Sequence, residues 1–98
     1  MLDLKRDQCA RMLGVISDPQ RLRIIECLSD GSHNVGEIAA CLGKHIVKVS
    51  HHLSVLKKAG LVKSNRKGRF IYYELQSEVS GSGGYLDLGC CRLDLSAQ

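Results

Sequence analysis

Two adjacent cysteines, Cys90 and Cys91, lie near the end of a 98-residue sequence. Thiolates are good ligands for soft, thiophilic ions, and accessible thiols can also be oxidised. Neighbouring side chains of a strand point to opposite faces, so one ion binds both sulfurs only where the backbone bends. Gly89, directly before the pair, permits such a bend. The pair is therefore a candidate for ion binding or thiol oxidation, and the structural alternative places one cysteine in the core and the other at the surface.

The other cysteines, Cys9, Cys27 and Cys41, fall among apolar residues in segments with helical periodicity. A free cysteine in such a place packs as a small hydrophobic side chain. We expect Cys27 and Cys41 to be buried, and Cys9 to pack in the core or at a subunit interface. An odd number of cysteines does not indicate a disulfide framework, and the lack of CxxC or paired Cys/His spacing argues against a zinc finger. The thiols are expected to be reduced, as in a cytoplasmic protein.

A basic run is the second feature that indicates a partner. Residues 44–69 contain eight lysines and arginines and no acidic residue, in a chain of formal net charge +4. A solvated face usually carries acidic residues too, so an uncompensated run indicates a polyanion. His51 and His52 lie in this run. Adjacent helical side chains diverge by about 100°, which argues against one metal ion bound by both.

The elements that position these residues follow from the apolar spacing. Intervals of three and four residues predict helices over residues 3–16, 19–29, 35–42 and 46–59. Asp18 and Pro19 suit the start of the second helix, and Asn34 with Glu37 has the pattern of a capping box at the third. A turn of three residues, 43–45, separates the last two helices, as in a helix-turn-helix.

The rest of the chain is expected to be extended. After Gly60 the apolar period changes from 3.6 to 2, which predicts an antiparallel hairpin formed by residues 61–65 and 69–75. The Gly/Ser-rich stretch 77–84 predicts a flexible linker. In the last segment Gly89 disfavours a helix, so strand or extended structure is expected there.

The predicted fold is therefore mainly α-helical with a small β-hairpin. We expect residues 1–76 to form a winged helix-turn-helix DNA-binding domain, and residues 77–98 to form a linker and a Cys–Cys tail. The sequence has no apolar run of about 20 residues, and charged residues stand where a signal peptide has its apolar region. These features predict a cytoplasmic protein that makes no contact with a membrane.

The predicted DNA surface combines the helix over residues 46–59 with the hairpin turn. The helix is expected to bury an apolar row and to expose short hydroxyls, histidines and lysine, the mix typical of a helix in the major groove. The basic turn can contact the DNA backbone or enter a minor groove. The residues assigned to DNA binding are Lys44, His45, Lys48, Ser50, His51, His52, Ser54, Arg66, Lys67 and Arg69.

The sequence resembles the ArsR/SmtB family of bacterial winged-helix repressors over about residues 5–76. The segments that carry the resemblance are DPQRLRIIECL, EIAACLG, VSHHLSVLKKAGLV and KGRFIYYEL. The resemblance implies a homodimer that binds double-stranded operator DNA near a promoter and releases it when an inducer binds. The sequence departs from the family where KHIVK opens the DNA-reading helix in place of a short polar residue, which bears on operator preference.

The resemblance also bears on the inducer. Asn34 and Gly36 stand where metal-sensing members carry CxC, and the C-terminal segment has no histidine for the family's other common site. Some members use adjacent cysteines for trivalent arsenic, which accepts three thiolates, and the first helix and the tail lie near the dimer interface in this fold. The resemblance therefore implies an inducer site at Cys90, Cys91 and Cys9 for trivalent arsenic or another thiophilic ion, with no cofactor required.

The sequence also allows functions other than a ligand-controlled repressor. A repressor without a small-molecule inducer would bind DNA with an affinity indifferent to metals and oxidants. A protein-interaction module could use the same surface, but such surfaces usually combine an apolar patch with mixed charges. An enzyme is not expected, because the sequence offers no phosphate-binding glycine loop and no nucleophile with a base and an orienting partner.

Overall fold

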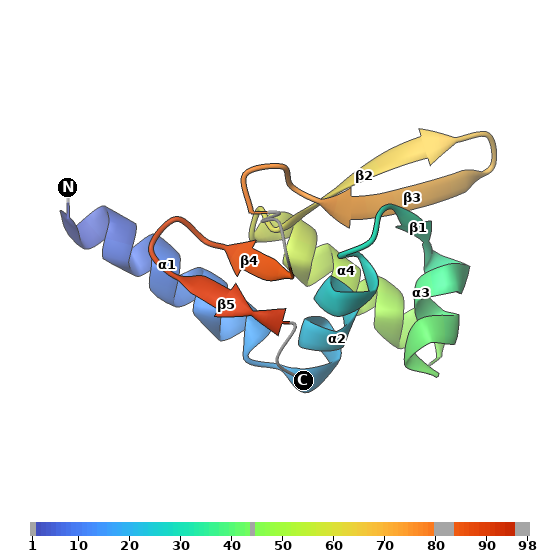
Figure 1. The fold of residues 1–98 in the computed structure, drawn as a ribbon. Coiled ribbons are helices and arrows are strands. Elements are labelled where there is room, and N and C mark those ends of the chain that lie inside the picture. Colours follow the sequence, from blue (N-terminus) through green and yellow to red (C-terminus); the bar gives the residue numbers. More distant parts are fainter. Residues whose placement is uncertain (1, 44, 80–83, 96–98) are drawn as a thin grey trace.

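The computed structural model describes residues 2–43, 45–79 and 84–95 (Figure 1). Its elements are, in chain order, α1 (Leu2–Ile16), α2 (Pro19–Cys27), β1 (His33–Asn34), α3 (Val35–Leu42), α4 (Ile46–Lys58), β2 (Val62–Lys67), β3 (Phe70–Leu75), β4 (Tyr85–Asp87) and β5 (Arg92–Asp94). The β2–β3 hairpin projects beyond the helices, and β4 and β5 lie along α1. The prediction of a mainly helical fold with a hairpin is confirmed. Within the described ranges, no helix is both long and apolar enough to cross a membrane.

Side-chain caps are present at the predicted starts of α2 and α3. The Asp18 carboxylate accepts hydrogen bonds from the backbone N–H groups of Gln20 and Arg21, at 2.8 and 3.2 Å. Asn34 and Glu37 form the capping box at the start of α3, with reciprocal bonds of 2.8 and 2.9 Å between side chain and backbone. These bonds satisfy N–H groups that lack partners within the helix, so they fix where each helix begins.

One hydrophobic core joins the helices to both sheets. Its fully buried large side chains are Ile24, Ile25, Ile38, Val49, Leu53, Leu56, Leu61, Val62 and Leu86. Leu86 comes from β4, and the nearby Val79 and Leu88 are only 6% and 7% exposed. Burial of apolar area supplies most of the stabilising free energy, at about 25 cal/mol per Å². The segment after β3 therefore helps to complete the core.

The larger sheet has the antiparallel order β1–β3–β2. Pairing between β2 and β3 runs from Val62 opposite Leu75 to Lys67 opposite Phe70. Each strand begins one residue later than predicted, and β2 ends two residues later. Gly68 makes the turn with a φ of +64°, which favours glycine. The sequence did not reveal β1, because two residues are too few to show a period.

β4 and β5 form an antiparallel pair, in agreement with the expected extended tail. The turn between them places Gly89 at a φ of +85° and closes with a 2.9 Å hydrogen bond from the Leu88 N–H to the Cys91 carbonyl. The apolar alternation of this segment therefore stops at Leu88, before the two cysteines. Half of the predicted Gly/Ser linker 77–84, residues 80–83, lies outside the described residues.

The expectation of reduced cysteines without disulfides is wrong in this structure. Sulfur–sulfur bonds join Cys9 to Cys90 and Cys27 to Cys41, and Cys91 is free. Burial of the helical cysteines was also predicted wrongly, because Cys27 is half-buried and Cys41 is exposed. Both lie where α2 and α3 meet, and the sequence spacing of each helix alone cannot show that contact.

Candidate nucleic-acid interface and sulfur cluster

Helix α4 has one buried face and one accessible face. Val49, Leu53 and Leu56 are fully buried in the core. The exposed side chains of the helix include Val47, Lys48, Ser50, His51 and Ser54. Because the buried row fixes the helix in rotation, these side chains are held toward solvent. This arrangement can present hydrogen-bonding and cationic groups to a groove of DNA.

Among the described residues, the start of α4 has no side-chain cap from its N-cap residue. Gly43 ends α3 in the left-handed conformation, with a φ of +67°, and so redirects the chain toward α4. His45 is the N-cap of α4 and is exposed, and its side chain makes no capping hydrogen bond within the described structure. The first N–H groups of a helix attract phosphate when they lack a side-chain cap. Lys44, which was assigned to the same region, lies outside the described residues.

His52 occupies a different position from the other DNA-assigned residues. It is half-buried, and its Nδ1 lies 3.2 Å from a guanidinium nitrogen of Arg21. The Arg21 Nε donates to the Val15 carbonyl at 2.6 Å, which fixes the guanidinium between the first two helices. Burial, with further contributions from Arg21, His51 and Lys48, lowers the pKa of His52 despite the opposing effect of Asp18. A neutral His52 accepting from Arg21 holds α4 against α2 and keeps its Nε2–H available.

The β2–β3 hairpin carries the second group of predicted residues. Arg66, Lys67 and Arg69 are exposed at its far end, beyond the helices in Figure 1. The Lys67 ammonium lies 5.6 Å from the centre of the Tyr72 ring, within cation–π range. At the base of the hairpin, Lys57 of α4 donates to the Ser64 hydroxyl at 2.7 Å. The hairpin is therefore tied to the helix whose exposed face it extends.

Val47 and Arg21 were missed by the sequence prediction. Val47 is 75% exposed, and its methyl groups suit contact with a thymine methyl group. Its position one residue after Ile46, off the buried row of α4, was the available signal. Arg21 acts through His52, 31 residues later. No local pattern indicates that contact, because it depends on how α2 and α4 pack.

The structure brings Cys9, Cys90 and Cys91 together between α1 and the β4–β5 turn. Their sulfur atoms all lie within 4.8 Å of one another. Cys9 and Cys91 are half-buried and Cys90 is exposed. A hollow of about 210 Å³ adjoins the cluster, and its lining residues are Lys5, Gln8, Cys9, Met12, Leu88, Gly89 and Cys90.

The donor set of this cluster fits a soft ion once the disulfide is reduced. Two sulfurs that each bind an ion at about 2.3 Å, as in zinc thiolates, lie at most about 4.6 Å apart. The three sulfurs are therefore close to ligating separation and need only small side-chain rotations. As a disulfide, Cys9 and Cys90 cannot serve as thiolate ligands, so ion binding and oxidation compete for the same atoms.

The sequence is similar to those of known bacterial regulatory proteins. The family described as "Bacterial regulatory protein, arsR family" matches residues 18–64. The chain is 42% identical over 64 residues to the transcriptional repressor SdpR of Bacillus subtilis, which covers 65% of this chain and 71% of SdpR. It is 38% identical over 73 residues to the HTH-type transcriptional regulator CmtR of Mycobacterium tuberculosis, covering 74% of this chain and 62% of CmtR.

Solved structures share the fold. A homodimeric winged helix-turn-helix DNA-binding domain, Mb0332 from Mycobacterium bovis, superposes with a TM-score of 0.67 at 35% identity, covering 70% of this chain and 64% of that one. Reduced HlyU from Vibrio cholerae gives a TM-score of 0.73 at 26% identity, with 78% and 80% of the two chains covered. The predicted winged helix-turn-helix fold is confirmed by these similarities.

Proposed function

Because the chain belongs to the arsR family of bacterial regulatory proteins, we propose that it is a repressor that binds operator DNA and is released by chemistry at the Cys9–Cys90–Cys91 cluster. One observation carries the DNA-binding part of the proposal. Helix α4 buries Val49, Leu53 and Leu56 completely and presents basic and hydrogen-bonding side chains on its exposed face. A family of regulators also agrees with the prediction that the chain is not an enzyme.

In this proposal the two basic surfaces have separate roles. Lys48, Ser50, His51 and Ser54 on α4 contact base edges and phosphates in the major groove. Arg66, Lys67 and Arg69 at the hairpin tip hold the flanking backbone or the adjacent minor groove. The amide groups at the start of α4, next to His45, bind a phosphate. His52 supports the surface by positioning α4 through Arg21.

The proposed repressor acts as a homodimer. Mb0332, which shares the fold, is described as a homodimeric DNA-binding domain. Two copies of α4 related by a twofold axis reach successive major grooves of a palindromic operator, about one helical turn apart. A dimer also doubles the number of phosphate contacts, which makes the affinity strongly dependent on salt.

A double substitution tests the DNA surface. Lys48→Ala with His51→Ala should weaken binding to a duplex from upstream of the protein's own gene by about 30-fold or more, because each base or phosphate contact on α4 contributes on the order of 1–3 kcal/mol. Fluorescence anisotropy at pH 8 measures the change. Arg23→Ala removes one exposed positive charge from α2, at a residue not assigned to DNA binding, and is the matched control.

Either of two results would remove the assignment of α4. One is normal operator binding by the double variant when circular dichroism shows a folded protein. The other is an equal loss of affinity in Arg23→Ala. Wild-type affinity should also fall with salt, with a log–log slope of about −5 or steeper if six or more phosphates are neutralised.

The proposed inducer site is the reduced form of the cluster. Three thiolates from α1 and the β4–β5 turn bind one thiophilic ion such as trivalent arsenic, or Cys9 and Cys90 are oxidised to the bond seen here. Either event joins the first helix to the tail. In a dimer whose interface involves these segments, this cross-link between α1 and the tail changes the distance between the two α4 helices.

The inducer test adds trivalent arsenic to the reduced protein bound to its duplex. Wild-type protein should release the DNA, and Cys90→Ser with Cys91→Ser should bind DNA normally but fail to release it. Cys27→Ser with Cys41→Ser is the matched control, with the same number of thiols removed, and should respond as wild type does. Release from the Cys90/Cys91 variant would exclude the cluster as the inducer site.

A further inference from the structure

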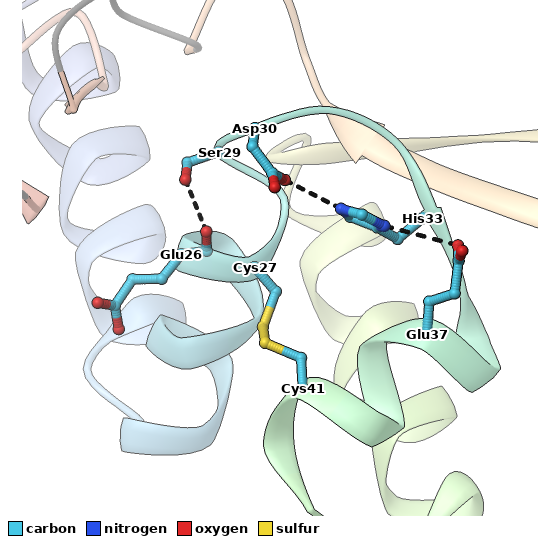
Figure 2. Close-up of a disulfide and its surroundings, with 7 residues drawn as sticks. All are labelled: Glu26, Cys27, Ser29, Asp30, His33, Glu37 and Cys41. Carbon is cyan, nitrogen blue, oxygen red and sulfur yellow. Dashed lines mark hydrogen bonds and ion pairs between the residues drawn. A yellow bond between two sulfur atoms is a disulfide. The ribbon is translucent and has the colours of Figure 1, made fainter.

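A second pair of sulfur atoms lies inside the helix-turn-helix unit. Cys27 is the last residue of α2, and Cys41 lies in the last turn of α3. Their Cα atoms are 6.6 Å apart and their sulfurs are bonded (Figure 2). This Cα separation is within the range of ordinary disulfides, so the packing of α2 against α3 already places the two thiols for a cross-link.

The pair is open to small molecules from two sides. Cys41 is exposed and Cys27 is half-buried. A hollow of about 580 Å³ is lined in part by Pro19, Arg23 and both cysteines, and another of about 350 Å³ by Asp30, His33, Glu37 and both cysteines. Neither hollow shares a lining residue with the one beside Cys90. The pair is therefore accessible and separate from the Cys9–Cys90–Cys91 cluster.

We propose that Cys27 and Cys41 form a second, independent redox site that reacts with low-molecular-weight disulfides such as oxidised glutathione. The Cys41 thiolate attacks one sulfur of glutathione disulfide, forms a mixed disulfide and expels one glutathione thiolate. The Cys27 thiolate then attacks the Cys41 sulfur and expels the second glutathione thiolate. Two protein thiols are oxidised and one glutathione disulfide is reduced to two glutathione molecules, with the two thiol protons released or taken up by glutathione.

The cross-link acts on the helix that leads into the DNA-reading helix. α3 has eight residues, and its buried contacts to the core come from Ile38 and Ala39. Closing the 14-residue separation between Cys27 and Cys41 restricts how far α3 can move from α2. α3 continues through the Gly43 turn into α4, so a restricted α3 also restricts the start of α4.

The chemistry is tested first in the wild-type protein. The tryptic peptide spanning residues 24–44 contains Cys27 and Cys41 and no other cysteine. After equilibration with glutathione disulfide, this peptide should escape alkylation and weigh two hydrogen atoms less than after reduction. Recovery of a stable glutathione adduct, or of a doubly alkylated peptide, would overturn the proposal.

The effect on α3 is tested without interference from the other cysteines. In a variant carrying Cys9→Ser, Cys90→Ser and Cys91→Ser, oxidation should slow amide hydrogen exchange over residues 35–43 by about threefold or more. Adding Cys27→Ser and Cys41→Ser to this variant gives the matched control, which has no thiol left to react and in which oxidant should have no effect. Equal exchange rates in the oxidised and reduced forms would overturn the role of the cross-link in fixing α3.

The same variant measures the effect on DNA binding. Oxidation should tighten binding to the duplex by about threefold. The cross-link already restricts the motion of α3 and α4, so DNA binding costs less conformational entropy. This measurement rests on the proposed function, whereas the peptide and exchange measurements do not. If both forms bind the duplex with equal affinity, the Cys27–Cys41 cross-link does not regulate DNA binding and this part of the proposal is overturned.

Discussion

The two cysteine regions of the molecule connect the chain over very different distances. The Cys9–Cys90 bond joins residues 81 positions apart and ties α1 to the β4–β5 turn. The Cys27–Cys41 bond joins residues 14 positions apart, both within the helix-turn-helix unit. The first therefore closes most of the chain into one loop, and the second fixes two neighbouring helices.

The regions also differ in the number of sulfurs that they offer. Cys91 adds a third sulfur within 4.8 Å at the first region, so the reduced form suits a soft ion as well as oxidation. The second region has two sulfurs at the meeting point of α2 and α3, which is enough for a disulfide. In the proposed repressor, cysteines therefore serve two inputs, one through the tail and one through the helices that position α4.

The largest expected effect is the loss of stability when the Cys9–Cys90 cross-link is removed from the oxidised protein. The chain-entropy model assigns about 4–5 kcal/mol to a cross-link over some 80 residues and about 3 kcal/mol to one over some 15 residues. Cys9→Ser should therefore lower the free energy of unfolding by about 1.5 kcal/mol more than Cys27→Ser. Urea unfolding of both variants without reductant measures the difference.

Reductant and a second variant control that comparison. With reductant present, both cross-links are open and the two variants should unfold at nearly the same urea concentration. Cys90→Ser should cost less than Cys9→Ser, because the nearby Cys91 sulfur can pair with Cys9 instead. Equal costs for Cys9→Ser and Cys27→Ser in the oxidised protein would show that loop length does not distinguish the two regions.

The packing of the tail is tested by Leu86→Ala. Leu86 in β4 is fully buried in the common core, so its truncation should cost about 2–5 kcal/mol even in the reduced protein. Tyr85→Ala, at a 45% exposed neighbour, is the control and should cost much less. Thermal or urea unfolding with reductant measures both, and equal stability of the two variants would mean that the tail contributes no core packing.

The smallest expected effect depends on pH and concerns the surroundings of Cys27–Cys41. His33 Nε2 lies 2.9 Å from the Asp30 carboxylate, and this hydrogen bond raises the pKa of His33 above its ordinary 6.5 and lowers that of Asp30 below 3.8 (Figure 2). The His33 contribution is complete below pH 6.5 and is lost as pH rises through the raised pKa; the Asp30 contribution is present above pH 3.8 and is lost as pH falls.

His33→Gln should therefore lower the melting temperature more at pH 5.5 than at pH 8, by on the order of 2 °C at the lower pH. Calorimetry at both pH values measures the change. His51→Gln on the exposed face of α4 removes a histidine without an equivalent carboxylate pair and serves as control. A loss for His33→Gln that is equal at the two pH values would exclude the ion pair as its cause.

Local chemistry made much of this molecule predictable from the sequence by itself. The apolar periods located helices α1 to α4, and the Asp18 cap and the Asn34–Glu37 capping box marked where two of them start. The change of period after Gly60 located the β2–β3 hairpin. These features depend on residues within one or two turns of each other, so their spacing in the sequence is enough to indicate them.

Tertiary structure alone decided the contacts between distant segments. The sulfur bonds, the burial of Leu86 in the common core and the hold of Arg21 on His52 each join residues of different elements. Such side chains are brought together by the path of the whole chain, as the helices and strands pack to bury their apolar surfaces. Local periodicity carries no record of that path, and so the sequence marked Cys9, Cys90 and Cys91 as candidates while the packing of α1 against the β4–β5 turn set their sulfurs side by side.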